Sequence, residues 1–282
     1  MREIYMKHFF SYFLVIFVLG ILSSCSSPDQ PLDSQHGYQK GEYLYRVHDE
    51  YLFTIHPPEA AQAQVYPWEK NVIGGCPKIT KEFFRCKGSG LNPEHVVQNE
   101  KETKRFYDCG GKHSLPLREG EEFIYPVLID LLNHIQAKTN SKVVITCGHS
   151  CPDHHAYSDQ TPDNRYSKHM IGAEVAFYVQ GMENSPEVII DLIKDFYKNE
   201  PKYLNKNEYI EFRAYEKDDT NVVTRPIYNK EIYIKIFKET EGRNFDNRHP
   251  YPYIAIQVRH DFDQKTKVAY SWNAAYRNYL RW

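Results

Sequence analysis

Apolar residues recur at helical spacing in two stretches of the chain. After Pro126, five aliphatic residues fall on one stripe, and their spacing predicts a helix: Val127, Leu128, Leu131, Leu132 and Ile135. The second stretch begins with Ser185-Pro186-Glu187, which supplies a capping residue, a first-turn proline and an early acid. The apolar stripe that follows predicts a second helix: Val188, Ile189, Leu192, Ile193 and Phe196.

Runs of β-branched and aromatic residues predict four strands. They lie over residues 142–146, 173–179, 232–237 and 253–259. The helices are segregated from the strands, and long loops join the strands. This order favours an α+β domain in which helices flank an antiparallel sheet.

The N-terminus carries a different hydrophobic pattern. Arg2 and Lys7 precede an apolar run over residues 12–22, and the run ends in Leu22-Ser23-Ser24-Cys25. A charged start, a short apolar segment and small residues before a cysteine are typical of an export signal. A transmembrane helix needs about 20 apolar residues, so this run is too short to be one.

The same residues resemble the lipobox of bacterial lipoproteins. The resemblance implies that the chain is cut before Cys25, and that this cysteine then carries the acyl chains that anchor the protein to the exported side of a membrane. Ser26 follows the cysteine where an Asp would indicate inner-membrane retention, so the outer membrane is favoured. An ordinary secretory signal with an incidental cysteine is the alternative interpretation.

Four segments are predicted along the chain. Residues 1–24 form the signal peptide, and residues 25–41 are the lipidated cysteine and a polar tether. Residues 42–121 are a loop-rich N-terminal extension with short strands, and residues 122–282 form the main domain. The 35 basic and 37 acidic residues nearly balance, which argues against nucleic acid as a partner and leaves recognition to a local site.

Five cysteines follow the predicted lipidation site. Cysteines of exported proteins usually form disulfides, and five is an odd number, so one thiol stays free or pairs between chains. One group lies in the extension and the other in Thr146-Cys147-Gly148-His149-Ser150-Cys151, whose two cysteines can bridge each other or receive a partner from the first group. The candidates for disulfides are Cys76, Cys86, Cys109, Cys147 and Cys151.

Two motifs between residues 146 and 177 resemble the zinc D-alanyl-D-alanine carboxypeptidases and dipeptidases of the Hedgehog/DD-peptidase fold. The turn that reads Thr-Ser-Gly-x-Arg-Ser-Pro-x-His in that family is here Thr146-Cys147-Gly148-His149-Ser150-Cys151-Pro152-Asp153-His154. The Ser-x-His-x-x-Gly-x-Ala-x-Asp motif is here Ser167-Lys168-His169-Met170-Ile171-Gly172-Ala173-Glu174-Val175-Ala176. The run Pro252-Tyr253-Ile254-Ala255-Ile256-Gln257-Val258-Arg259 stands where the family has His-x-Asp-x-Arg. The resemblance covers about residues 122–262.

The family's chemistry requires two histidines and an aspartate on zinc, together with a general base and an arginine. His169 matches the first ligand, but Ala176, Ala255 and Ser150 stand where the family has ligand Asp, ligand His and Arg. Glu174 shares a strand face with Ala176 but lies about 6.6 Å along it. We therefore expect a non-catalytic domain that binds peptidoglycan stem peptide or an envelope protein, or serves as a scaffold.

Three alternatives stay open from the sequence. An active zinc peptidase would need rearranged ligands such as His169, Glu174 and His154. A cysteine enzyme would pair Cys147 with His149 or His169. A structural envelope protein would be linked between chains through its odd cysteine.

Overall fold

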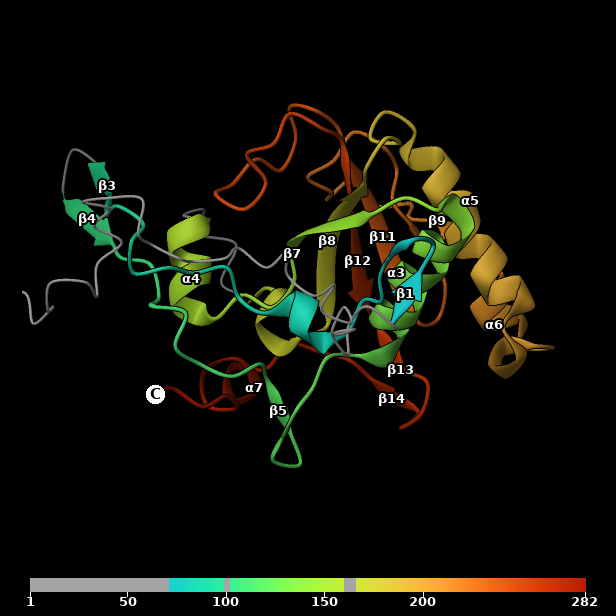
Figure 1. Ribbon diagram of the computed structural model, residues 1–282, viewed down its shortest axis with the longest axis horizontal. Coiled ribbons are helices and arrows are strands. Elements are labelled where there is room, and N and C mark those ends of the chain that lie inside the picture. The colour runs from blue at the N-terminus through green and yellow to red at the C-terminus, as the bar shows by residue number, and fades with distance from the viewer. Residues whose placement is uncertain (1–70, 99–101, 160–165) are drawn as a thin grey trace, which may run out of the picture. The chain divides into compact units, whose positions relative to one another are not determined.

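The computed structural model describes residues 71–98, 102–159 and 166–282, which belong to one compact unit beginning at Val65 (Figure 1). The predicted signal peptide, the lipidation site at Cys25, the tether and the first part of the extension lie outside the described residues. So does the cut between residues 24 and 25. Those predictions remain predictions.

A six-stranded antiparallel sheet forms the centre of this unit. Its order is β7 (Val143–Cys147), β8 (Glu174–Val179), β12 (Tyr253–Val258), β11 (Ile232–Phe237), β10 (Ile227–Tyr228) and β9 (Arg213–Ala214). The four longest strands are those that the β-branched and aromatic runs predict. The two-residue edge strands were not predicted, because so short a segment has no alternation to detect.

The two predicted helices are confirmed as α3 (Pro126–Thr139) and α5 (Pro186–Asn199), which lie together on one side of the sheet (Figure 1). Alternate strand residues face these helices and join their apolar stripes in one core. That core includes Leu128, Leu131 and Ile193 from the helices and Val175, Phe177, Ile234, Ile254 and Ile256 from the strands. The other face of the sheet carries Glu174, Ala176, Ala255 and Gln257, which makes it the face available for a site.

Short elements connect and cover this frame. The helical ones are η1 (Lys81–Phe84), α4 (Pro152–Ser158), η3 (Lys168–Ile171), η4 (Pro201–Tyr203), α6 (Asn207–Ile210) and α7 (Trp272–Tyr276). Four two-stranded hairpins pair β1 (Val72–Ile73) with β2 (Cys76–Pro77), β3 (His95–Gln98) with β4 (Thr103–Phe106), β5 (Leu117–Arg118) with β6 (Glu121–Glu122), and β13 (His260–Asp261) with β14 (Thr266–Lys267). The described fold is therefore mixed, with antiparallel sheets and few helices, in agreement with the predicted α+β class.

Two buried amides of α3 hold the described part of the N-terminal extension against the domain. Asn133 accepts a hydrogen bond from the Ile79 backbone N–H at 2.9 Å and donates to the Ile79 carbonyl at 2.8 Å. Gln136 donates to the carbonyls of Ile73 and Pro77 at 3.1 and 3.0 Å. Ile79 and Phe84 are themselves part of the main core. The extension thus shares the core of the main domain from Ile79 onward.

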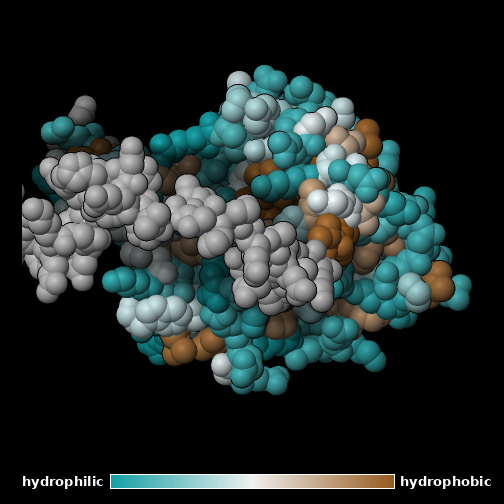
Figure 2. All heavy atoms as spheres, viewed as in Figure 1, coloured by the Kyte–Doolittle hydropathy of each residue, from teal (hydrophilic) through white to brown (hydrophobic). Residues whose placement is uncertain are grey.

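Most of the surface is hydrophilic on the face shown in Figure 2, with hydrophobic residues scattered over it. Among the described residues, no helix is long and apolar enough to span a membrane.

Candidate functional site

A polar pocket opens on the sheet face opposite α3 and α5. Its floor consists of two cross-strand pairs in register, Glu174 with Gln257 and Ala176 with Ala255. His169, in η3 just before β8, lies beside the first pair. The alternation of the strands brings these residues to one face, as the sequence predicts, and the β8–β12 register places them side by side.

Two separate hydrogen bonds orient the histidine and the carboxylate of the pocket. The Nδ1 atom of His169 donates to the Gly148 carbonyl at 2.7 Å, because a carbonyl can only accept. The other ring nitrogen, Nε2, therefore lies toward Glu174, whose Oε1 is 3.7 Å away. The same Oε1 accepts from Gln257 Nε2 at 2.9 Å. His169 and Glu174 thus offer two potential metal ligands, next to two alanines that offer none.

A lysine and a pair of aromatic residues also line the pocket. Lys235 donates from Nζ to Asn221 Oδ1 at 2.7 Å, and burial lowers the pKa of Lys235. The rings of Phe237 and Tyr253 stack with their centroids 4.6 Å apart. Both aromatic residues also line the pocket. The pocket therefore combines a cation, a carboxylate, amides and an apolar wall, which are the groups that a peptide or other polar ligand requires.

The structure does not bring His154 into this pocket. Its Nδ1 lies 2.6 Å from Asp108 Oδ1 and its Nε2 lies 3.0 Å from Asp246 Oδ1, so both ring nitrogens are engaged. Burial by itself would lower the pKa of His154, but its hydrogen bonds and attraction to Asp246 and Asp108 outweigh burial and raise the pKa to about 9. His154 is therefore held between two carboxylates and does not join His169 and Glu174.

A second cluster brings together Cys86, Cys109, His113 and Cys151, whose ligand atoms all lie within 4.8 Å of one another. The Sγ atoms of Cys86 and Cys109 are 3.8 Å apart, and His113 Nε2 is 3.6 Å from Cys109 Sγ. The other ring nitrogen of His113, Nδ1, donates to the Ser114 carbonyl at 2.9 Å, so Nε2 is the ring nitrogen on the side of the thiols. These four side chains can hold a metal ion.

Local structure explains how three segments deliver these ligands. Cys86 follows η1, and Cys151 caps α4, where its sulfur accepts from the His154 backbone N–H at 3.4 Å. A Cβ atom at Gly88 would overlap the Cys109 sulfur, so a glycine is needed there. Hydrogen bonds with Cys151 and Cys86 lower the pKa of the Cys109 thiol, whereas the hydrogen bond with Cys109 raises the pKa of the Cys86 thiol.

The predicted disulfides are not confirmed. All five described candidates are free thiols, and the 3.8 Å between the Cys86 and Cys109 sulfurs is far longer than an S–S bond of about 2.05 Å. Cys151 does meet cysteines of the extension, which was one of the arrangements left open. The sequence reasoning missed His113, although its spacing in Cys109-x-x-x-His113 is a signal that could have found it.

The remaining cysteines lie elsewhere. Cys76 lies in β2, and Cys147 packs with Ala176 and Ala255 beneath the pocket. Burial raises the pKa of the Cys147 thiol well above its usual value, so this thiol is poorly suited to act as a nucleophile. The imidazole of His149 is likewise buried, and burial lowers its pKa to about 3.

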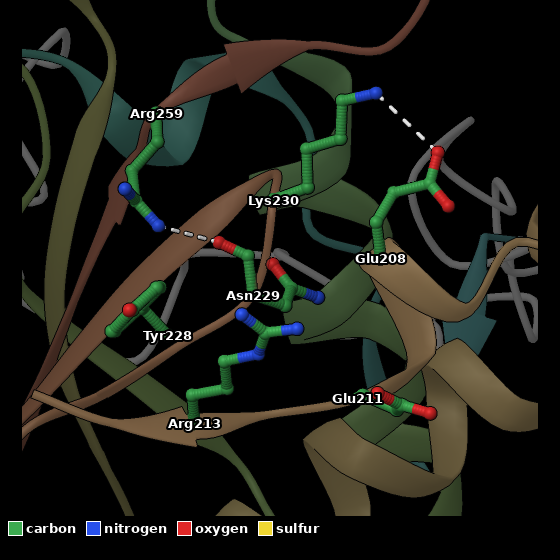
Figure 3. Close-up of a pocket in the computed structure, with 7 residues that line it drawn as sticks. All are labelled: Glu208, Glu211, Arg213, Tyr228, Asn229, Lys230 and Arg259. Atoms are coloured by element: carbon green, nitrogen blue, oxygen red, sulfur yellow. Dashed lines mark hydrogen bonds and ion pairs between the residues drawn. The ribbon is translucent and has the colours of Figure 1, made fainter.

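A second pocket lies by β10 and the end of β12 (Figure 3). Arg259 donates from Nη1 to the Asn229 carbonyl at 2.7 Å, and Lys230 Nζ lies 3.4 Å from Glu208 Oε1. Arg259, which ends the third motif of the resemblance, therefore belongs to this pocket. It is not among the described residues that line the pocket at His169.

Comparison with protein-family models, with curated proteins and with solved structures finds no match for this chain.

Proposed function

We propose that this chain is a lipid-anchored protein of the bacterial cell envelope, and that its described domain binds a ligand through the polar pocket without cleaving it. The observation that carries the proposal is the pair of alanines, Ala176 and Ala255, side by side on the pocket floor. A catalytic zinc needs three protein ligands and an activated water. Methyl groups at two of the expected ligand positions supply neither a ligand nor a base, whereas the groups suited to binding are present.

Peptidoglycan stem peptide is the ligand that the two motifs suggest, and an envelope protein is the other. Lys235 offers a cation for a peptide carboxylate, and the Gln257 and Asn221 amides offer hydrogen bonds to peptide groups. The lipobox resemblance at Cys25 supports an anchor that would hold this pocket next to the cell wall. The anchor and the envelope location rest on that resemblance.

Binding and cleavage are tested on the full chain in detergent. Calorimetric titration with a soluble muropeptide ending in D-alanyl-D-alanine is expected to show binding, and mass spectrometry is expected to show uncleaved peptide. Lys235→Gln should weaken binding about tenfold or more, because a charge-assisted hydrogen bond contributes about 1.5–3 kcal/mol. Lys230→Gln, a lysine of the separate pocket at β10, is the matched control and should bind as the parent does. Absence of binding would contradict the stem-peptide proposal.

One observation favours a second candidate, an active zinc peptidase. The His169 ring turns Nε2 toward Glu174, as two ligands of one metal would be arranged. This candidate predicts that the parent cleaves the peptide. It also predicts that His169→Ala loses both this activity and one zinc ion per chain. Cleavage of that kind would replace the binding proposal.

The peptidase resemblance implies zinc. We propose that zinc has a structural role in this chain and binds outside the pocket. The Cys/His cluster offers four ligands, whereas His169 and Glu174 offer two. A protein cross-linked through its odd cysteine is the third hypothesis, and gels without reductant that show only monomer would exclude it.

A further inference from the structure

The densest group of metal-binding side chains among the described residues is the Cys86, Cys109, His113 and Cys151 cluster. We propose that these four residues form a tetrahedral, structural zinc centre that fastens the N-terminal extension to the main domain. The inference does not depend on what the polar pocket binds.

The distances within the cluster fit one zinc ion. Zn–S bonds of about 2.3 Å and Zn–N bonds of about 2.1 Å at tetrahedral angles put two sulfurs about 3.8 Å apart, and a sulfur and an imidazole nitrogen about 3.6 Å apart. The Cys86–Cys109 sulfur distance is 3.8 Å and the Cys109–His113 distance is 3.6 Å. The spacing therefore leaves room for the ion between the ligands.

The ligand types select zinc and a structural role. Three thiolates and one imidazole are soft ligands that suit zinc over magnesium or calcium, which prefer oxygen. Four protein ligands fill a tetrahedral shell, so no position is left for a catalytic water. The His113 ring is oriented by its bond to the Ser114 carbonyl, which is the usual outer support of a zinc-bound histidine.

The packing around the cluster indicates what a metal would contribute there. Cys109, Cys151 and Tyr279 form a small buried group of their own, separate from the main core, with Cys86 at its margin. A zinc ion would join the segment after η1, the loop at Cys109–His113 and the start of α4. The small buried group at the cluster is not part of the main core, so a metal would add a second point of attachment beside that core.

A disulfide accounts for the cluster less well. It would use two of the three sulfurs, leave a third buried thiol beside them and give His113 no role. Zinc uses all four side chains, and it holds the thiols as thiolates, which are then unavailable for pairing.

The test measures metal directly on the full chain, purified in detergent with a reductant. Elemental analysis is expected to give one zinc per chain in the parent. The ion should be lost in Cys86→Ser, His113→Asn and Cys151→Ser, and should be retained in Cys147→Ser, which alters a buried cysteine outside the cluster. Replacement of zinc by Co²⁺ in the parent should produce the intense visible bands of tetrahedral thiolate coordination.

The cobalt spectrum keeps the test decisive if the variants fail to fold, because it needs only the parent protein. Parent protein that holds no zinc, and that gives no thiolate–cobalt bands after reduction, would overturn the proposal. So would zinc retained in both His113→Asn and Cys151→Ser, or a Cys86–Cys109 disulfide found by peptide mapping of protein isolated without reductant. Because the muropeptide titration is separate, failure of the pocket proposal leaves this result unaffected.

Discussion

The amide of Asn133 offers a sharp test of how the extension is attached. Asn133 is 8% exposed, and its side chain makes both backbone hydrogen bonds of Ile79, which is 1% exposed. In Asn133→Leu, the Ile79 N–H and carbonyl stay buried without partners. Each unsatisfied group costs about 1–3 kcal/mol, so for the two groups we expect the free energy of unfolding to fall by about 2–6 kcal/mol.

A second substitution at the same position separates hydrogen bonding from shape. Asn133→Asp keeps the acceptor for the Ile79 N–H but directs an oxygen at the carbonyls of Ile79 and Ile129, which the amide meets at 2.8 and 3.0 Å. A protonated carboxyl can donate to a carbonyl, whereas a carboxylate cannot. Burial also raises the pKa of such a carboxyl in the folded state, so its stabilising contribution is lost as the pH rises. We expect Asn133→Asp to cost more stability at pH 7 than at pH 4.

Urea unfolding followed by circular dichroism measures both variants. Asn199, an exposed amide at the end of α5, supplies the control Asn199→Leu, which should stay within about 0.5 kcal/mol of the parent. The reasoning is refuted if Asn133→Leu costs no more than this control. It is also refuted if the loss in Asn133→Asp, relative to the parent at the same pH, does not change between pH 4 and pH 7.

Three further predictions concern close packing and a buried carboxyl. A Cβ at Gly148 would lie 2.6 Å from Phe84 Cα, so Gly148→Ala should lower the free energy of unfolding in urea by about 1–3 kcal/mol. Gly110 has open space around it, so Gly110→Ala is the control and should change the stability little. Equal losses of stability in the two variants would contradict the close approach of Gly148 to Phe84. The Tyr203 hydroxyl donates to Glu231 Oε2 at 2.5 Å, so Tyr203→Phe should lose about 1.5–3 kcal/mol, and an unchanged urea midpoint would argue against this bond. Burial raises the pKa of Glu231, so the stability of the parent should fall as the pH rises above the unfolded value of about 4.3. The stability of Glu231→Gln relative to the parent should therefore rise between pH 4 and pH 7. A fall in this relative stability over the same range would refute the burial argument.

The main elements of the fold could be predicted because each carries its own periodicity. The stripes from Val127 to Ile135 and from Val188 to Phe196 gave α3 and α5, and the β-branched runs gave the four long strands. The hairpins of the extension could not be predicted in this way. Their strands have two to four residues, and the segment from Ile73 to Ile79 is held by the side chains of α3, whose partners no local pattern reveals.

The candidate sites, like the fold, could be predicted only in part from the sequence. Strand alternation puts Glu174 on the face of Ala176 and puts Gln257 on the face of Ala255, which the sequence determines by itself. The pairing of these two strands, and therefore the Glu174–Gln257 contact, depends on a register that only the folded sheet decides.

The cysteines show most clearly what the sequence alone does not determine. The sequence by itself determined which side chains could bind metal or form disulfides, because that depends on their chemistry alone. Only the tertiary structure decided that Cys86, Cys109 and Cys151 meet at His113, while Cys76 and Cys147 lie elsewhere. Contacts between distant segments arise from how the core packs, and no short-range pattern records them.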